Sequence, residues 1–272
     1  MQKVVLITGC SSGFGNLIAK LLASKNYKVY AGVRKASGMD GLKSIKNITP
    51  IILDTTSSQT RINSIVAGIV RDDGKIDVLI NNAGFGYLGM IGNFTESETR
   101  AQFETNFFGY VKVINAALPY MRSVRKGLII NINSILGLVS LPFYGVYSAS
   151  KFALDSLTST LRVEESFNNI NFISIYPGSF NTNFWNNIKW SHGSDSLNKI
   201  LQKLAGKASA HRDNPQKVAD IILKIINTKS PKRRYIVGWE ANLMYGIYRL
   251  TPYFILEWIG KKLIKKLYTM PG

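Results

Sequence analysis

The chain has 272 residues, of which 46% are hydrophobic and 18% are charged, a balance that excludes disorder through most of its length. Such a length predicts one large domain or two small ones. Lys and Arg number 34 against 16 Asp and Glu, and the net charge of +18 would suit nucleic acid, anionic lipid or an anionic cofactor alike. No recognised nucleic-acid-binding motif accompanies the charge, so we expect no nucleic-acid partner.

Cysteine and histidine are scarce, which limits the chemistry open to the chain. A single cysteine, Cys10, excludes an intramolecular disulfide, and the two histidines are His192 and His211. We therefore predict no metal centre and a reducing, cytoplasmic location. No stretch reaches the ~20 uninterrupted apolar residues of a membrane-spanning helix, so any contact with a membrane is expected to be peripheral.

Short apolar runs alternate with longer segments of helical periodicity, which predicts one Rossmann-type α/β domain with a doubly wound parallel sheet and helices on both faces. The predicted strands are Val4–Thr8, Lys28–Val33, Thr49–Leu53, Val78–Asn81, Gly127–Ile132, Asn171–Tyr176 and Tyr235–Val237. The predicted helices are Asn16–Ser24, Ser58–Arg71, Ser97–Arg122, Ser148–Ser166 and Pro215–Asn227.

A glycine-rich loop follows the first predicted strand and opens a helix. It reads Thr8-Gly9-Cys10-Ser11-Ser12-Gly13-Phe14-Gly15. Glycines there allow a tight turn and let backbone N–H groups approach a pyrophosphate at the positive end of the helix. The loop predicts a dinucleotide site, with Cys10 as a packing residue rather than a redox group.

The end of the second strand predicts which dinucleotide is bound. NAD-specific folds place an acidic residue there for the ribose 2′-hydroxyl, whereas a basic residue accommodates a 2′-phosphate. This chain has Arg34 and Lys35 and no acid at that point, and Arg suits bidentate phosphate recognition. We therefore predict NADP(H) rather than NAD(H).

Tyr147 and Lys151 lie four residues apart on a predicted helix, so they share one face. A nearby ammonium group lowers the pKa of a phenol, which is otherwise a poor acid or base at neutral pH. Ser134 follows an apolar strand, at the sheet edge where ligands of parallel sheets bind. These three residues predict a proton-transferring site.

With these motifs in order, the chain resembles the short-chain dehydrogenase/reductase family, in its single-domain Tyr-x-x-x-Lys branch. The similarity covers roughly the first 182 residues. The further motifs that carry it are Asp54, Asn81-Asn82-Ala83-Gly84, Asn106 and Pro177-Gly178 with Thr182. Where the family often has two serines together, this chain has Asn133-Ser134.

The resemblance implies a role for each catalytic residue. Tyr147 would exchange a proton with the substrate oxygen, and Ser134 would orient that oxygen. Lys151 would hold the nicotinamide ribose and lower the pKa of Tyr147, and Asn106 would hold a water that links Lys151 to solvent. The implied contacts of the cofactor come from Asp54 and Thr55 at the adenine, Asn82, Ala83 and Gly84 at its wall, and Pro177, Gly178 and Thr182 at the carboxamide.

The substrate side is predicted to be apolar. Aromatic residues follow the last motif, in an expected lid at about 179–214, and more apolar residues precede Tyr147. The chain is also loosely similar to the hydroxysteroid and retinol dehydrogenase-like group, which implies a hydrophobic carbonyl or alcohol as substrate and a homo-oligomer, a dimer or a tetramer. A 3-oxoacyl reductase and a non-catalytic NADP sensor are the alternatives.

We predict that the chain divides into a catalytic domain, residues 1–238, and a basic amphipathic extension, residues 239–272. Leu256, Ile259, Leu263 and Leu267 fall on one helical stripe, opposite several lysines. Two interpretations of this stripe stay open. Either it lies on an anionic membrane surface, or it packs on the parent domain or a second subunit.

Overall fold

The computed structural model describes residues 2–192, 200 and 212–269. Its main sheet has seven parallel strands in the order β3-β2-β1-β4-β6-β7-β9. They are β1 (Val4–Ile7), β2 (Lys28–Val33), β3 (Ile48–Ile52), β4 (Val78–Asn81), β6 (Gly127–Ile132), β7 (Ile170–Pro177) and β9 (Arg234–Val237). This is the predicted doubly wound α/β fold, and the strand order reverses between β1 and β4, where such sheets bind ligands.

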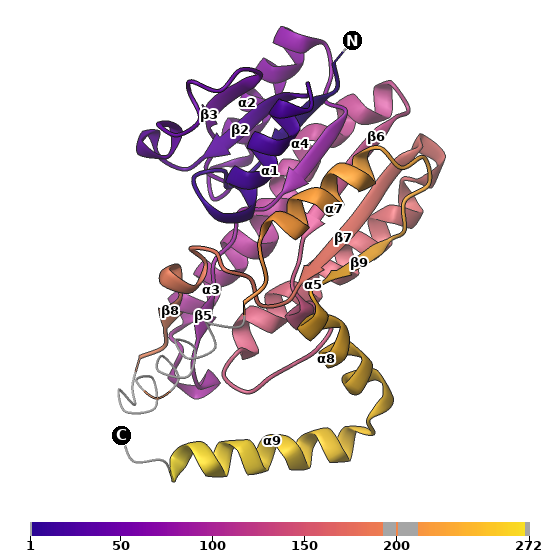
Figure 1. Ribbon diagram of the computed structural model, residues 1–272. Helices are drawn as coiled ribbons and strands as arrows, with labels where there is room; N and C mark the ends of the chain where they lie inside the picture. The colour runs from indigo at the N-terminus through magenta and orange to yellow at the C-terminus, as the bar shows by residue number, and fades with distance from the viewer. Residues whose placement is uncertain (1, 193–199, 201–211, 270–272) are drawn as a thin grey trace.

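Helices cover both faces of the sheet (Figure 1). Their bounds are α1 (Gly13–Ser24), α2 (Gln59–Asp73), α3 (Glu96–Phe103), α4 (Gly109–Ser123), α5 (Gly145–Glu164), α7 (Gln216–Ile226), α8 (Trp239–Leu250) and α9 (Tyr253–Tyr268). Side chains of α1 and α7 share one buried cluster with the sheet, and those of α2 and α4 share another. The sheet is therefore buried on both sides, which explains its near-continuous apolar strands.

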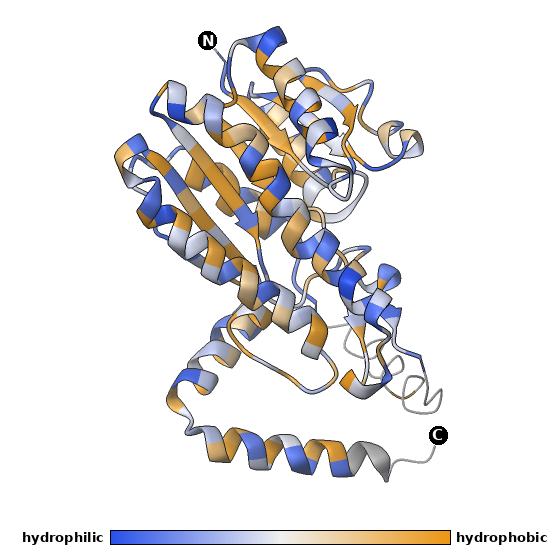
Figure 2. Ribbon diagram, turned by 180° about the vertical axis from the view of Figure 1, so that it is seen from behind, coloured by the Kyte–Doolittle hydropathy of each residue, from blue (hydrophilic) through white to orange (hydrophobic). Residues whose placement is uncertain are grey.

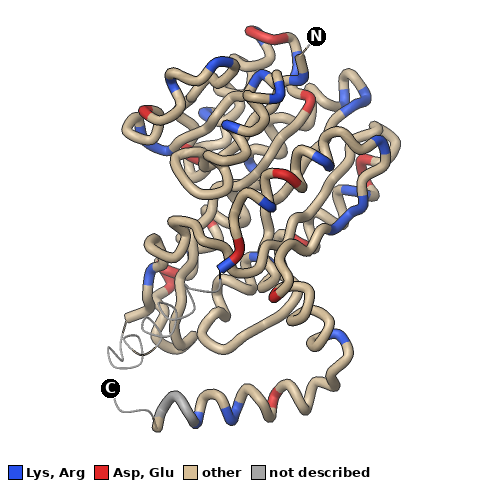
Figure 3. The backbone as a smooth tube through the Cα atoms, viewed as in Figure 1, with Lys and Arg blue, Asp and Glu red and all other residues tan. Residues whose placement is uncertain are grey.

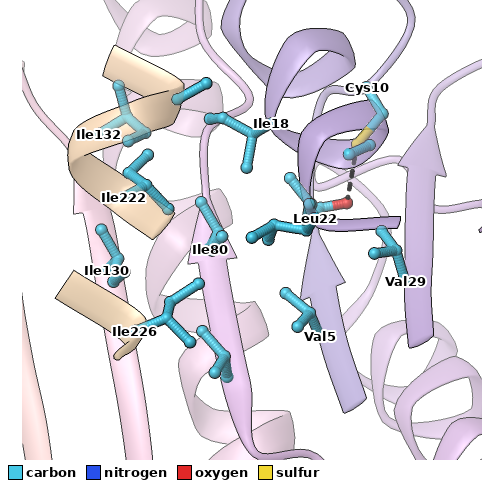
Figure 4. Close-up of a cluster of buried hydrophobic side chains, with 14 of the residues drawn as sticks. Val5, Cys10, Ile18, Leu22, Val29, Ile80, Ile130, Ile132, Ile222 and Ile226 are labelled. Carbon is cyan, nitrogen blue, oxygen red and sulfur yellow. Dashed lines mark hydrogen bonds between the residues drawn. The ribbon is translucent and has the colours of Figure 1, made fainter. Parts of the chain in front are cut away.

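Figure 4 shows the first of these clusters, where α1 and α7 meet above the central strands. Ile18 and Leu22 lie one turn apart on α1, and Ile222 and Ile226 lie one turn apart on α7. All four are buried, because the i, i+4 spacing turns them to the same side of each helix. The packing fixes the start of α1 at the carboxyl end of β1.

The predicted helix Ser97–Arg122 is divided in the structure. A π-helical turn, Glu104–Phe108, separates α3 from α4 and contains the buried Asn106. Helix α3 begins at Glu96 because Thr95 and Glu98 form a reciprocal capping box. Single π-helical turns are frequent at functional sites, and this one places Asn106 behind the loop that follows β4.

A second, two-stranded sheet was not predicted. It pairs β5 (Tyr87–Leu88) with β8 (Lys189–Trp190) in parallel. Strands this short carry too little periodicity to stand out in a sequence. The pairing holds the segment after β4 against the segment after β7, so it closes one side of the site.

Candidate active site

The glycine loop adopts backbone conformations that require glycine. Gly9 and Gly13 have φ values of 71° and 59°, in the region that side chains disfavour. At Gly15 the constraint is space, because an added Cβ would lie 2.4 Å from the carbonyl oxygen of Gly9. These glycines draw the loop tightly around the start of α1.

The loop is held against the end of β4 by a compact hydrogen-bond network. The Asn82 side chain donates from Nδ2 to the carbonyl oxygens of Thr8 and Gly9, at 2.9 and 3.0 Å. The Thr8 hydroxyl oxygen accepts from the backbone N–H groups of Asn82 and Ala83, at 2.9 and 3.0 Å. Two strands that are distant in sequence thus form one rigid floor.

The start of α1 is arranged for an anion. Ser12 is its N-terminal cap residue, yet the Ser12 side chain makes no capping hydrogen bond. The first N–H groups of a helix have no partner within the helix, so those of α1 point toward the loop. Cys10 is fully buried below, and burial raises the pKa of its thiol, which fits the predicted packing role.

The two cationic residues that follow β2, Arg34 and Lys35, are placed differently. The Arg34 side chain lines a cavity of about 790 Å³ that begins at the glycine loop. Lys35 is exposed and is not among the lining residues. Asp54 and Thr55 line the cavity near Arg34, and the Asp54 carboxylate accepts hydrogen bonds from the backbone and hydroxyl of Thr56 at 3.0 and 2.8 Å.

Ser134, Tyr147 and Lys151 meet at the middle of the same cavity. Ser134 follows β6 and accepts a hydrogen bond from the Leu136 N–H at 3.2 Å. Tyr147 and Lys151 lie one turn apart on α5, as predicted, and both are buried. The Lys151 Nζ donates to the carbonyl oxygen of Ile132 at 3.0 Å.

Burial controls the acidity of this cluster. It raises the pKa of Tyr147 to about 12, and a hydrogen bond with Ser134 lowers that pKa only in part. It also lowers the pKa of Lys151 to about 7. The predicted lowering of the Tyr147 pKa by Lys151 is therefore wrong here, because loss of solvation dominates and the ammonium lies 6.0 Å from the ring centroid.

Two asparagines position the cluster, Asn106 from behind the cavity wall and Asn133 from the wall itself. Asn106 donates to the carbonyl oxygen of Phe85 at 3.0 Å and accepts from its N–H at 3.2 Å, so it fixes the loop after β4. Asn133 accepts from the Ser134 N–H at 2.9 Å and donates to the carbonyl oxygen of Lys151 at 3.1 Å. Asn133 thus ties the serine to the tyrosine helix, a role that sequence spacing did not reveal.

The far end of the cavity is lined by aromatic side chains. The Phe184 ring lies 5.8 Å from the ring of Tyr147, centroid to centroid. Trp185 donates from its indole N–H to the carbonyl oxygen of Phe180 at 3.0 Å, and the Arg212 guanidinium lies over the Trp185 ring at 4.1 Å. Residues 193–199 and 201–211 of the predicted lid, with His211, lie outside the described residues.

Most of the predicted site residues line this one cavity. They are Gly9, Ser11, Ser12, Gly13, Phe14, Arg34, Asp54, Thr55, Asn82, Ala83, Gly84, Ser134, Tyr147, Lys151, Pro177, Gly178 and Thr182. Four others lie outside the lining: Thr8, Gly15, Lys35 and Asn106. Of these, Thr8, Gly15 and Asn106 are buried behind the wall, where they support it.

Further lining residues come from positions that carried no sequence signal. Helix α8 contributes Glu240, Ala241 and Met244. Lys189, on β8, lines the cavity with its ammonium 5.2 and 5.4 Å from the ring centroids of Phe85 and Tyr87. These elements reach the site only through the tertiary structure, which local sequence patterns do not show.

No cluster of three or more metal-ligating side chains occurs within the described residues. His192 is largely exposed, and its ring lies 2.9 Å from the buried Glu98 carboxylate at the start of α3. It therefore holds the end of β8 near α3 and lies apart from the cavity lining.

Comparison with known proteins agrees with this geometry. Residues 3–192 match the family model for short chain dehydrogenases. The chain is 38% identical to the 3-ketodihydrosphingosine reductase of Bacteroides thetaiotaomicron, over 90% of this chain and 91% of that protein. A short-chain dehydrogenase from Streptomyces avermitilis has a similar structure, with a TM-score of 0.83, 29% identity and coverage of 97% and 95% of the two chains.

A third relative was solved with a dinucleotide. ElxO with NADP bound has a TM-score of 0.73 and 26% identity to this chain, with coverage of 87% of this chain and 96% of that one. The family model covers well over half of the present chain, and the predicted serine, tyrosine and lysine meet in one cavity with the glycine loop. The chain belongs to the short-chain dehydrogenase family.

Proposed function

We propose that this protein is an NADP(H)-dependent oxidoreductase that reduces a carbonyl group on a hydrophobic substrate. The observation that carries the proposal is one continuous cavity with the glycine loop and Arg34 at one end. Ser134, Tyr147 and Lys151 stand at its middle, and the aromatic wall forms the other end. Cofactor, proton donor and apolar substrate would thus meet in a single space.

The choice of NADP(H) rests on charge at the end of β2. Arg34 lines the cavity there, Lys35 follows it, and neither of them is an acid that would repel a 2′-phosphate. The tight glycine loop and the start of α1 fit a pyrophosphate, since an added Cβ at Gly15 would strike the loop itself. NADP in the related ElxO structure supports the same choice.

The protein's own residues would supply the proton and the geometry, while bound NADPH supplies the hydride. With its pKa raised to about 12, Tyr147 is neutral at physiological pH and can donate its proton to a carbonyl oxygen that is becoming an alcohol. Ser134 would hold that oxygen by a hydrogen bond. The neutral phenol is the form that carbonyl reduction requires, whereas alcohol oxidation would require the phenolate.

Lys151 would act on Tyr147 from the same helix face. Its pKa of about 7 lets it change charge near neutral pH, so it can take up and release protons while the phenol is reprotonated. Asn106 would connect Lys151 to solvent through a bound water, as the family resemblance implies. Asn133 is a positioning residue in this scheme, since it touches only Ser134 and the Lys151 backbone in the hydrogen bonds of the site.

We infer that the substrate is a long-chain lipid ketone. Aromatic and apolar side chains dominate the end of the cavity beyond Tyr147, among them Phe143, Phe184, Trp185, Trp190 and Met244. Apolar walls with few polar groups are typical of sites for hydrophobic ligands. The named activity of the Bacteroides thetaiotaomicron relative, a reductase of 3-ketodihydrosphingosine, supports this class of substrate.

The test compares Tyr147→Phe with Tyr144→Phe, since both tyrosines line the cavity. Turnover of a long-chain ketone with NADPH is followed optically, and NADPH binding is titrated separately. Tyr147→Phe is expected to lose about a thousandfold in turnover, because the proton donor is removed, while its cofactor affinity stays nearly unchanged. Near-parent turnover in Tyr147→Phe would refute the proposal, and NADPH binding without any turnover by the parent would indicate a sensor instead.

A further inference from the structure

Helix α8 has two apolar faces, and among the residues that the structure describes only one of these faces packs against the rest of the protein. Its inner face packs into a buried cluster beside the active site, through Ala241, Met244, Tyr245 and Tyr248. On the opposite side four apolar residues are exposed, at the i, i+4, i+8 and i+11 positions that form one helical stripe. They are Trp239, Leu243, Ile247 and Leu250, the last of them 85% exposed.

Helix α9 continues this exposure after the elbow at Pro252. It lies apart from the main sheet and runs across the bottom of Figure 1, beneath the rest of the chain. Phe254, Trp258, Ile259 and Leu263 are all exposed on it, and Tyr253 at its start is 76% exposed. Among the apolar side chains of α9 that the structure describes, only Ile264 packs in a cluster with a buried residue, Phe143. So many large apolar side chains along one stretch indicate an interaction surface.

The charge of this stretch selects the partner. Lys261, Lys262 and Lys265 are exposed on α9, and Figures 2 and 3 show apolar and basic residues alternating along the helix. At 100° per residue the three lysines fall on one side and Leu256, Ile259 and Leu263 on the other. An apolar stripe opposite a lysine-rich face is typical of a helix that lies in a lipid interface. Trp258 falls on the lysine side, where the Lys262 Nζ lies 3.8 Å from its ring centroid.

The two helices also border the substrate end of the active site. Glu240, Ala241 and Met244 of α8 line the cavity, and Phe143 both lines it and packs against Ile264 of α9. Phe143 has a φ of 70°, a strained conformation for a bulky side chain, so the loop is held in place at this junction. A surface bound by α8 and α9 would therefore lie next to the route by which a substrate reaches Tyr147.

We propose that α8 and α9, the lipid arm, dock on the surface of an anionic bilayer and bring the substrate end of the cavity to the membrane. Docking needs only the exposed apolar residues and the lysines. Delivery of a lipid ketone from the bilayer rests in addition on the proposed function. No helix in the described part of the chain is both long and apolar enough to cross a bilayer, so the arm lies along the surface.

Docking is tested by sedimentation with vesicles of phosphatidylcholine alone or with phosphatidylglycerol added. The full chain is expected to pellet with the anionic vesicles at low salt. Lys261→Gln/Lys262→Gln/Lys265→Gln should weaken the partition on the order of a hundredfold, and Ile259→Gln/Leu263→Gln about tenfold or more. These positions are exposed, so the substitutions leave the folded core intact.

Matched controls come from elsewhere on the surface. Lys20→Gln/Lys25→Gln/Lys46→Gln removes the same charge from exposed positions of the catalytic domain. Val163→Gln/Phe167→Gln removes exposed apolar groups near the end of α5. Both controls should pellet like the parent. Equal loss in the controls and the arm variants, or a parent that stays in the supernatant with anionic vesicles, would overturn the proposal.

A second copy of the chain is the competing occupant of the lipid arm. Sedimentation equilibrium without lipid distinguishes the two occupants. If Ile259→Gln/Leu263→Gln dissociates an oligomer and the parent does not bind vesicles, the face is a subunit interface and the proposal is wrong. Delivery is measured separately, by comparing turnover of a ketone embedded in vesicles with turnover of a short soluble ketone. The arm variants should lose only the first activity, whereas a parent that reduces neither ketone but still pellets contradicts the proposed function alone.

Discussion

The two ends of the cavity are built from different materials. The glycine-loop end consists mainly of backbone groups, whose positions are fixed by positive φ angles, by missing side chains and by hydrogen bonds from Asn82. The aromatic end consists of large side chains, such as Phe143, Phe184 and Met244, that come from segments far apart in the sequence. Rigid backbone suits a constant ligand, whereas replaceable side chains suit a ligand that differs among relatives.

This difference predicts how each end responds to mutation. A change at the glycine-loop end should disturb the fold and weaken the binding of NADPH and NADH equally. The exception is a change to a group that contacts only one of the two nucleotides. A change at the aromatic end should alter the use of one substrate class and leave the fold intact. Four substitutions test the contrast, and the first is expected to have the largest effect.

Gly15→Ala tests the rigidity of the glycine-loop end. The new Cβ would lie 2.4 Å from the Gly9 carbonyl oxygen and 2.5 Å from the Asn82 side-chain nitrogen. Relief of that clash must move backbone, so we expect the free energy of unfolding to fall by about 3 kcal/mol, with weaker binding of NADPH and NADH alike. Gly68→Ala, in the middle of α2, would place its Cβ at an ordinary contact distance of 3.7 Å from the Arg71 side chain, and should instead raise stability by up to ~1 kcal/mol. Urea unfolding measures both; similar stability of the two variants would contradict a rigid loop.

Arg34→Ala tests the one group at this end that is predicted to read the nucleotide. Loss of a guanidinium paired with the 2′-phosphate removes about 1.5–3 kcal/mol, roughly ten- to a hundredfold in NADPH affinity, and leaves NADH binding unchanged. Lys35→Ala is the matched control, because Lys35 is exposed and is absent from the cavity lining. Lys35→Ala should weaken the binding of NADPH by much less. Tighter binding of NADH than of NADPH by the parent would contradict the assignment, as would equal losses for the two nucleotides.

Phe184→Ala tests the aromatic end. The ring lies 5.8 Å from that of Tyr147, so its removal takes apolar wall from beside the reacting group. We expect the KM for a long-chain ketone to rise about tenfold, with a smaller change in kcat, because contact with the chain is lost. The KM for a short soluble ketone and the unfolding midpoint should stay near the parent values. A general loss of activity toward both ketones would show that Phe184 supports the catalytic residues rather than the substrate wall.

The same contrast explains what could be predicted from the sequence. Strands β2, β4 and β6 have the predicted bounds, because continuous apolar runs flanked by turn residues are a local signal. A similar reason applies to the glycine loop, Ser134 and the Tyr147/Lys151 pair. Each motif is short, and its spacing follows from the local geometry of a turn or a helix. These motifs belong to the glycine-loop end and the middle of the cavity.

The parts that were missed depend on contacts between distant segments. The β5–β8 pairing joins residues about a hundred positions apart in two-residue strands, and no local pattern announces it. Asparagine is common in turns, so Asn133 does not stand out in the sequence. Its hydrogen bond to the carbonyl oxygen of Lys151 forms only when α5 packs beside β6. The error on the Tyr147 pKa has the same origin, because burial depends on the whole fold whereas the Lys151 spacing does not.

Lys151 lies where the two ends meet, and its burial gives the smallest of the four predicted effects. Its pKa is about 7 in the folded protein and near the ordinary value of 10.5 in the unfolded chain. Between these values the unfolded chain binds more protons, so the free energy of unfolding rises with pH, by about 1 kcal/mol from pH 7 to pH 8. Below pH 7 the lysine is charged in both states and this dependence disappears. Tyr147, with a pKa of about 12, contributes only above pH 10, where its ionisation in the unfolded chain lowers the free energy of unfolding.

Lys151→Met should therefore remove about 1 kcal/mol of the rise between pH 7 and pH 8. Urea unfolding of parent and variant across pH 6.5–8.5 measures it, and parallel curves would show that Lys151 keeps an ordinary pKa despite its burial.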